Sequence, residues 1–279
     1  MTADIAAPGT RRPGAGRLPA RRGVVAPLVG SLLAVLLWWA VTTPLAATGS
    51  MLASFAPQRA VPAIGELAAR GVLLDDVLTS LWRLLVGLLI AGLLGVVLGL
   101  AVGSLPILDD ATRPLFQLLR MISPLAWAPV AIGLFGIGHR PVFFLVAAAS
   151  VWPIVLNTSA GVRAVDRDLR MVARSLGASR WEATTSIVLP TVRPHLLTGV
   201  RLALGIGWVV LVPAEMLGVT SGLGYEILNA RDQLAYPQVM GLILVIGVLG
   251  YLLDLLARRV LGSPRSRSGR TLGSVPQRV

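Results

Sequence analysis

The stretch VDRDLRMVARSLGASRWEATTSIVLPTVRP, residues 165–194, is a charged segment that lies between long apolar runs. Its first half predicts a short amphipathic helix, because apolar and basic residues recur on opposite faces at helical spacing. The apolar face holds Leu169, Val172, Ala173 and Leu176, and the opposite face holds Arg167, Arg170 and Arg174. Gly177 predicts the end of this helix, since glycine readily adopts the left-handed conformation that follows a final helical turn.

Ser179 and Glu182 form an S-x-x-E pattern, which is typical of a capping box at the start of a helix. We expect this second helix to include Trp181 and to be interrupted by Pro190, because proline lacks the backbone donor. The segment therefore predicts two short helices joined by a turn. Its apolar face needs another surface to bury it, and a partner protein is the expected one.

The composition indicates an integral membrane protein. Of the 279 residues, 55% are hydrophobic and only 14% are charged, which is too apolar for an ordinary soluble domain. The formal charge of +12 comes with 25 arginines and no lysine; these arginines flank apolar runs, so we expect them to face lipid rather than nucleic acid. A P-loop requires a lysine, so any ATP hydrolysis must take place on another chain. The chain has no cysteine for disulfides or thiolate metal sites.

The apolar runs divide the chain into tails, spans and loops. Residues 1–23 predict a disordered basic cytosolic tail, and 24–43 predict a first transmembrane helix, which is longer than the apolar core of a usual signal peptide. Residues 44–81 predict an outer loop with a short interfacial helix at 62–69. Residues 82–257 predict a core of five more spans, and 258–279 a second basic cytosolic tail. The core runs are 84–108, 121–138, 141–162, 202–214 and 233–253, of which the second and fourth extend back to near Pro114 and Pro194.

The arginines predict the orientation. With the amino terminus inside, 18 arginines lie in inner segments and only five in outer ones, namely Arg59, Arg70, Arg83, Arg140 and Arg231. Both termini and the loop 163–193 are therefore expected to be cytosolic.

Within the spans, Ala91, Gly95, Gly99 and Gly103 recur every four residues and predict a smooth face for close helix packing. Prolines and polar residues inside apolar runs are typical of helices that line a passage. The same prolines are equally consistent with simple kinks, and the polar residues with contacts between helices. The candidates for a translocation path are Arg120, Pro124, Trp127, Asn157, Trp208 and Glu215. For Arg120, Arg201 and Asp254 the alternative is snorkelling or an interhelical ion pair, and for Glu215 a pairing with a neighbouring helix near the outer interface.

The segment 165–194 resembles the "EAA" loop of ABC importer permeases. Gly177, Ile187, Leu189 and Pro190 stand at the spacing of the G, I, L and P of that signature, whereas Met171 and Val172 replace its E-A. In that family the loop is the coupling helix, which docks in a groove of a cytosolic ATPase. The resemblance implies that the ATPase-coupling residues are Leu169, Val172, Ala173, Arg174, Leu176, Gly177, Ala178, Ser179, Glu182, Leu189 and Pro190.

Residues 115–138, 151–169, 198–218 and 221–231 resemble the nitrate, sulfonate and taurine class of these permeases, aliphatic sulfonate permeases in particular. The resemblance implies an all-α, six-span type I importer permease in a bacterial inner membrane. It also implies a second copy of the chain, two ATPase subunits that carry ATP and Mg²⁺, and an extracytoplasmic substrate-binding protein. The implied cargo is a small anion such as an aliphatic sulfonate, taurine or nitrate, with bicarbonate or a vitamin precursor as alternatives.

We expect no catalytic residue, metal site or cofactor in this chain. A different class, an ion-coupled secondary transporter that uses Glu215 and Asp254, predicts two related halves. The sequence has no such internal repeat.

Overall fold

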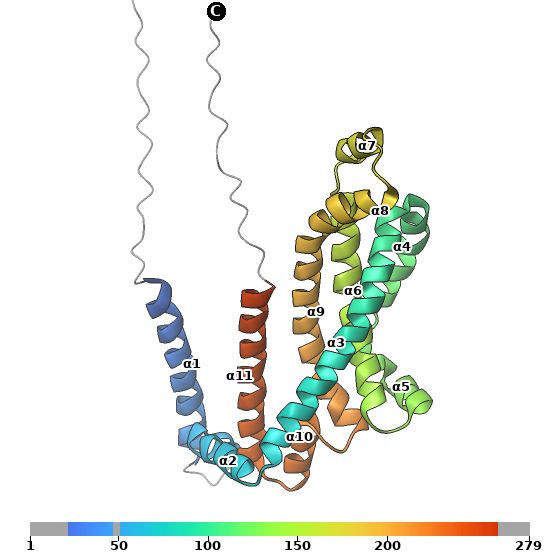
Figure 1. Ribbon diagram of the computed structural model, residues 1–279. Coiled ribbons are helices and arrows are strands. Elements are labelled where there is room, and N and C mark those ends of the chain that lie inside the picture. Colours follow the sequence, from blue (N-terminus) through green and yellow to red (C-terminus); the bar gives the residue numbers. More distant parts are fainter. Residues whose placement is uncertain (1–21, 47–50, 262–279) are drawn as a thin grey trace, which may run out of the picture. The chain divides into compact units, whose positions relative to one another are not determined.

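The computed structural model describes residues 22–46 and 51–261, which contain helices and no strand (Figure 1). The chain divides into two compact units, Met1–Pro57 and Gln58–Val279. In the first unit, α1 (Arg22–Ala46) precedes a short 3-10 helix, η1 (Met51–Phe55), and the indole Nε1 of Trp38 donates to the carbonyl oxygen of Phe55 at 3.1 Å. The predicted tails lie outside the described residues, except for residues 22–23, which begin α1, and 258–261, where α11 ends at Val260.

The second unit holds the rest of the helices. In chain order they are α2 (Pro57–Ala69), α3 (Val72–Ser104), α4 (Pro106–Met121), η2 (Pro124–Trp127), α5 (Ala128–Phe135), α6 (His139–Arg163), α7 (Arg167–Ser175), α8 (Arg180–Ala183), the π-helix η3 (Thr184–Val188), α9 (Leu189–Gly218), α10 (Leu223–Asp232) and α11 (Tyr236–Val260). In Figure 1, α7 and α8 lie at one end of α6 and α9, and α5 and α10 lie at the other.

Four helices of the described residues are long and apolar enough to cross a membrane: Val72–Ser104, His139–Arg163, Trp181–Gly218 and Tyr236–Val260. A bent pair, Pro106–Met121 with Pro124–Phe135, makes a fifth if it counts as one span. The first helix contributes a shorter apolar segment, Val29–Thr43. The polytopic helical architecture is confirmed, while the sixth span stays a prediction.

The outer segment contains more helix than we expected. Helix α2 has 13 residues rather than the predicted 62–69, and α3 begins at Val72, inside the segment 44–81 that was predicted to be a loop. Gly71 separates the two helices with a φ of 76°, which glycine adopts without steric penalty. The 33 residues of α3 make a helix about 50 Å long, more than the roughly 30 Å of a hydrocarbon core, so α3 is long enough to cross that core with tilt.

The predicted span from near Pro114 to residue 138 is not a straight helix, because the chain bends by 87° between α4 and the η2–α5 segment. Ile122 and Ser123 both have a ψ of 128°, which is extended backbone. Pro124 explains the break, since a proline ring disfavours helical geometry in the residue before it.

Pro190, unlike Pro124, does not end its helix. We expected it to interrupt the second helix of the loop, but the helix continues from Trp181 to Gly218. The π-helix at Thr184–Val188 precedes the proline, and the backbone N–H of Leu189 donates to the carbonyl of Thr184, five residues back. This wider turn relieves the crowding between the proline ring and the carbonyl four residues before it.

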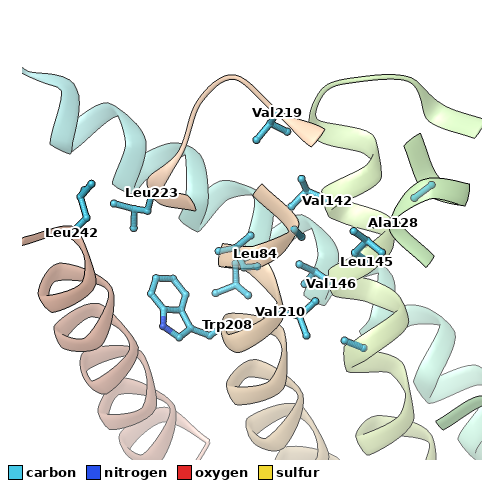
Figure 2. Packing of buried hydrophobic residues seen from close by; sticks show 14 of the residues in the cluster. Leu84, Ala128, Val142, Leu145, Val146, Trp208, Val210, Val219, Leu223 and Leu242 are labelled. Atoms are coloured by element: carbon cyan, nitrogen blue, oxygen red, sulfur yellow. The ribbon is translucent and has the colours of Figure 1, made fainter. Parts of the chain in front are cut away.

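Helix α6 packs between α3 and α9. The predicted small-residue face of α3 lies against α6: an added Cβ at Gly95 would lie 2.8 Å from the Cβ of Ile154, and one at Gly99 would lie 2.6 Å from the Cβ of Thr158. The close packing predicted for this face is therefore confirmed. Toward the α10 end of the unit, an apolar core joins α3, α6, α9 and α11 (Figure 2); its buried members include Leu84, Val142, Leu145, Val146, Trp208, Leu211, Leu223 and Leu242. This core fixes the helices that carry the loop and the groove described next.

Candidate coupling loop and translocation groove

The turn after α7 is a Schellman motif. Gly177 has a φ of 80°, the backbone N–H of Ala178 donates to the carbonyl of Ala173 at 3.0 Å, and that of Leu176 donates to the carbonyl of Val172 at 3.0 Å. These bonds satisfy carbonyls that the end of a helix leaves unpaired. The predicted helix end at Gly177 is confirmed.

The predicted capping box is also confirmed. The backbone N–H of Ser179 donates to Oε2 of Glu182 at 2.7 Å, and the N–H of Glu182 donates to Oγ of Ser179 at 3.2 Å. The two residues thereby pair two otherwise orphaned donors at the start of α8. A short turn, fixed at both ends by hydrogen bonds, joins the two helices.

The loop presents large apolar side chains to its surroundings. Leu176 is 81% exposed and Trp181 is 75% exposed, and Val172 and Leu189 are also exposed. Of the other coupling candidates, Gly177, Ser179, Glu182 and Pro190 are exposed, and Ala173 and Ala178 are half-buried. The side chains of Leu169 and Arg174 lie outside what the structure describes. Exposed apolar area of this kind marks an interaction surface.

A groove of about 550 Å³ lies among α4, η2, α6 and α9. Four of the six path candidates line it together: Arg120, Pro124, Trp127 and Asn157. The bend between α4 and η2 brings the first three to this place, and Asn157 comes from α6, where its Nδ2 donates to the carbonyl of Pro153 at 2.8 Å. The rest of the lining is largely apolar, with Trp152, Phe144 and Leu202 among it.

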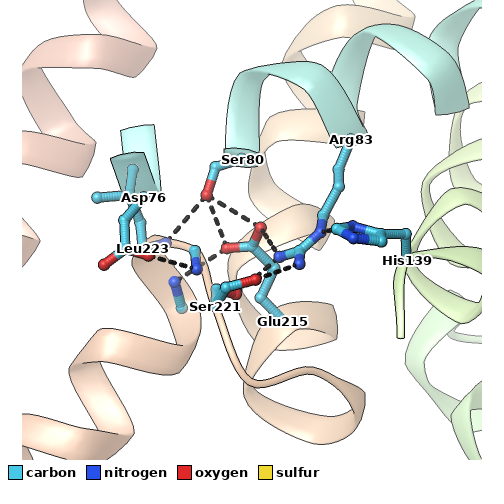
Figure 3. A network of polar contacts seen from close by, with 9 residues as sticks. Asp76, Ser80, Arg83, His139, Glu215, Ser221 and Leu223 are labelled. Carbon is cyan, nitrogen blue, oxygen red and sulfur yellow. Dashed lines mark hydrogen bonds and ion pairs between the residues drawn. The ribbon is translucent and has the colours of Figure 1, made fainter. Parts of the chain in front are cut away.

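Glu215 and Trp208, the other two path candidates, do not line this groove. Glu215 is fully buried in a polar network (Figure 3), where its Oε1 accepts from Nη1 of Arg83 at 2.8 Å. The same carboxylate accepts from Oγ of Ser80 at 2.9 Å and from the backbone N–H of Gly224 at 3.0 Å. Trp208 packs toward α11, since an added Cβ at Gly250 would lie 2.5 Å from its Nε1.

The network fastens the turn before α10 to α3. Nη1 of Arg83 also donates to the carbonyl of Ser221 at 2.7 Å, and the N–H of Gly222 donates to Oδ1 of Asp76 at 2.7 Å (Figure 3). Arg83 was predicted to be an outer flanking charge, but it is 1% exposed and lies within α3. Its position inside the apolar sequence LWRLLV was the available signal, since a charge in a span is expensive unless it is paired.

Arg201 and Asp254 form an interhelical ion pair between α9 and α11, with Nη2 of Arg201 3.3 Å from Oδ1 of Asp254. This is one of the two alternatives expected for these residues. Arg258 contacts the other carboxylate oxygen of Asp254 at 2.6 Å. Within the described residues no group of three histidine, aspartate or glutamate side chains is placed to hold a metal ion.

The described residues form long apolar helices, with a groove beside one broken helix and an exposed apolar loop at the end of two others, an arrangement that fits a membrane permease subunit. The chain belongs to the family of binding-protein-dependent transport system inner membrane components, which matches residues 91–263. It is thus a membrane permease subunit by family.

Three relatives illustrate the range of the family. The nitrate import permease protein NrtB of Leptolyngbya laminosa is 34% identical over 65% of this chain and 65% of its own length. The bicarbonate transport system permease protein CmpB of Synechococcus elongatus is 34% identical over 83% of this chain and 86% of its own. The taurine transport system permease protein TauC of Escherichia coli is 35% identical over 80% and 83%.

Two solved structures share the fold. A crystal structure of an amino acid ABC transporter with histidines has a TM-score of 0.56 at 15% identity, covering 71% of this chain and 94% of that one. An inward-facing conformation of the MetNI methionine ABC transporter has a TM-score of 0.52 at 18% identity, covering 64% and 92%. The fold is therefore that of a type I ABC importer permease.

Proposed function

We propose that this chain forms the membrane pathway for a small oxyanion or sulfonate and is driven through residues 165–190 by a separate ATPase. The exposed apolar surface of Val172, Leu176 and Trp181 carries the proposal, because it is an interaction surface at the end of two spans. The absence of lysine means that nucleotide hydrolysis must come from the partner.

The proposed assembly has two copies of this chain, two ATPase subunits on the cytosolic side and a substrate-binding protein outside. Both termini and the α7–α8 loop face the cytosol, as the arginine distribution predicts. The nucleotide cycle of the ATPase pushes on the loop, and the helices that continue from it carry the movement to the groove. This is a two-state change coupled through one contact.

The proposed cargo follows from the groove and from the relatives. Nitrate, bicarbonate and taurine are the substrates in the names of the relatives, and each carries a small anionic group. Arg120 gives the otherwise apolar groove a guanidinium that suits such a group, because guanidinium pairs well with planar and tetrahedral oxyanions.

Docking is tested by placing a charge on the exposed apolar surface at the end of α7. Leu176→Asp should abolish co-purification of the partner ATPase, whereas Ser175→Asp, which adds the same charge at a neighbouring exposed residue that is already polar, should leave it intact. Equal retention by both variants would contradict the proposed docking surface. Uptake of nitrate, bicarbonate and taurine by the reconstituted complex then identifies the cargo, and uptake by this chain alone would favour a secondary transporter.

A further inference from the structure

A second cavity adjoins the groove. It has a volume of about 190 Å³ and shares Arg120, Trp152 and Leu156 with the groove, so the two lie next to each other along α4 and α6. Its lining differs in kind, because it also contains Arg113, Gln117 and Arg163. At about 30 Å³ for each water molecule, the cavity has room for one small ion with part of its hydration.

Three polar residues of the cavity lie on one face of α4. Arg113, Gln117 and Arg120 follow each other at spacings of four and three residues and therefore share one face of α4. No residue of α4 is buried, so its side chains remain accessible in this chain. The rings of Phe116 and Trp152 lie 5.4 Å apart and join α4 to α6 beside the cavity.

The charges of the cavity are unbalanced. Arg163 is paired, because its Nη1 donates to Oδ2 of Asp109 at 3.0 Å and its Nη2 donates to Oγ of Ser159 at 3.2 Å. Arg113 and Arg120 belong to none of the ion pairs among residues 22–46 and 51–261. Three arginines face one aspartate, so the lining keeps two formal positive charges next to an apolar groove. Cations placed in or beside a span require a counter-charge.

We propose that this cavity is a second binding station for the transported anion, on the way from the groove to the Asp109–Arg163 end of α4. Arg120 binds the anion where the groove meets the cavity, and Gln117 and Arg113 then bind it inside the cavity. The two arginines are seven positions apart, which corresponds to about 10 Å of helix, so they act in succession rather than as one clamp. Several weak sites in series allow an ion to enter and also to leave.

Binding is tested without transport by phenylglyoxal labelling of the purified chain in neutral phosphatidylcholine nanodiscs, followed by mass spectrometry of each arginine. Methanesulfonate should protect Arg113 and Arg120, whereas the uncharged methanesulfonamide should not. Arg70, which is exposed and far along the chain, should label equally throughout. Absence of methanesulfonate protection at Arg113 would overturn the proposal. Protection by added phosphatidylglycerol alone would overturn it too, because the occupant would then be a lipid headgroup.

Transport supplies the second readout. The direction in which the anion moves through the two sites rests on the proposed function. The labelling result does not depend on that function, so the binding site and the proposed function can be refuted separately. Arg113→Gln should lower anion uptake by the reconstituted complex about tenfold, the loss expected for one hydrogen bond to a charged group, with ATPase binding unchanged. Arg70→Gln is the matched control and should transport normally. Unchanged uptake by Arg113→Gln would overturn the role of this station in transit.

Discussion

Arg83 and Glu215 are 132 residues apart in the chain, yet Nη1 of the arginine lies 2.8 Å from Oε1 of the glutamate. The two side chains are 1% and 0% exposed, and the carboxylate also accepts hydrogen bonds from Ser80 and from the backbone of Gly224. The pair therefore ties α3, α9 and the turn before α10 together at one buried point.

Removing one member of this pair should be more harmful than removing both. Arg83→Met leaves the buried carboxylate of Glu215 without its cation, and we expect the free energy of unfolding to fall by about 3–5 kcal/mol. In the double variant Arg83→Met/Glu215→Met the unpaired charge is gone, so part of the stability should return. Thermal unfolding in detergent measures both variants, and a double variant no more stable than Arg83→Met would contradict the pairing.

Gly222→Ala should loosen the turn before α10. Gly222 has a φ of 97°, and an added Cβ would lie 2.5 Å from Oε1 of Glu215. Both the strained backbone and the clash with the carboxylate should lower the free energy of unfolding, by about 1–3 kcal/mol. Gly247→Ala in α11 is the control, since nothing lies within 4 Å of its added Cβ. Similar unfolding temperatures for the two variants would refute this account of the turn.

Gly99→Leu should separate α3 from α6. An added Cβ would lie 2.6 Å from the Cβ of Thr158 and 2.9 Å from the carbonyl oxygen of Val155, so the helices must move apart. The loss in free energy of unfolding should be about 1–3 kcal/mol or more. Gly92→Leu lies on the same helix with nothing within 4 Å and should be nearly neutral. Chemical unfolding of both variants decides the matter, and a tolerant Gly99 would disprove the close contact.

Ser179→Ala should fray the start of α8. The variant loses the Oγ that accepts from the backbone N–H of Glu182, so that N–H should exchange with deuterium faster than in the parent. Ser175→Ala, an exposed serine in the preceding helix, serves as the control and should not alter exchange at α8. Unchanged exchange after Ser179→Ala would mean that the cap contributes nothing to the loop.

Features set by neighbouring residues could be predicted from the sequence. The capping box of Ser179 and Glu182 and the helix end at Gly177 depend on residues within one turn of each other. The small-residue face of α3 repeats every four positions, which one helix turn fixes. Of the path candidates, the four that line the groove come from the broken third span and from α6.

The partner of the buried Arg83 could not be predicted, because a contact between distant residues depends on the fold. Arg83 was assigned to an outer segment because a charge at the edge of an apolar run is ordinarily a flank, and only the fold brings Glu215 to it. The prolines show the same limit. Pro124 breaks its helix, whereas the helix that contains Pro190 continues, with a π turn directly before the proline.

The π turn at Thr184–Val188 also sets the direction in which α7 and α8 point about the axis of α9. Such a turn contains one residue more than an α-helix requires, and each α-helical residue rotates the chain by about 100°. Deleting a single residue there would restore a regular helix and swing α7 and α8 by roughly that angle about the axis of α9. The one additional residue of the π turn therefore determines the direction in which Leu176 and Trp181 face a partner.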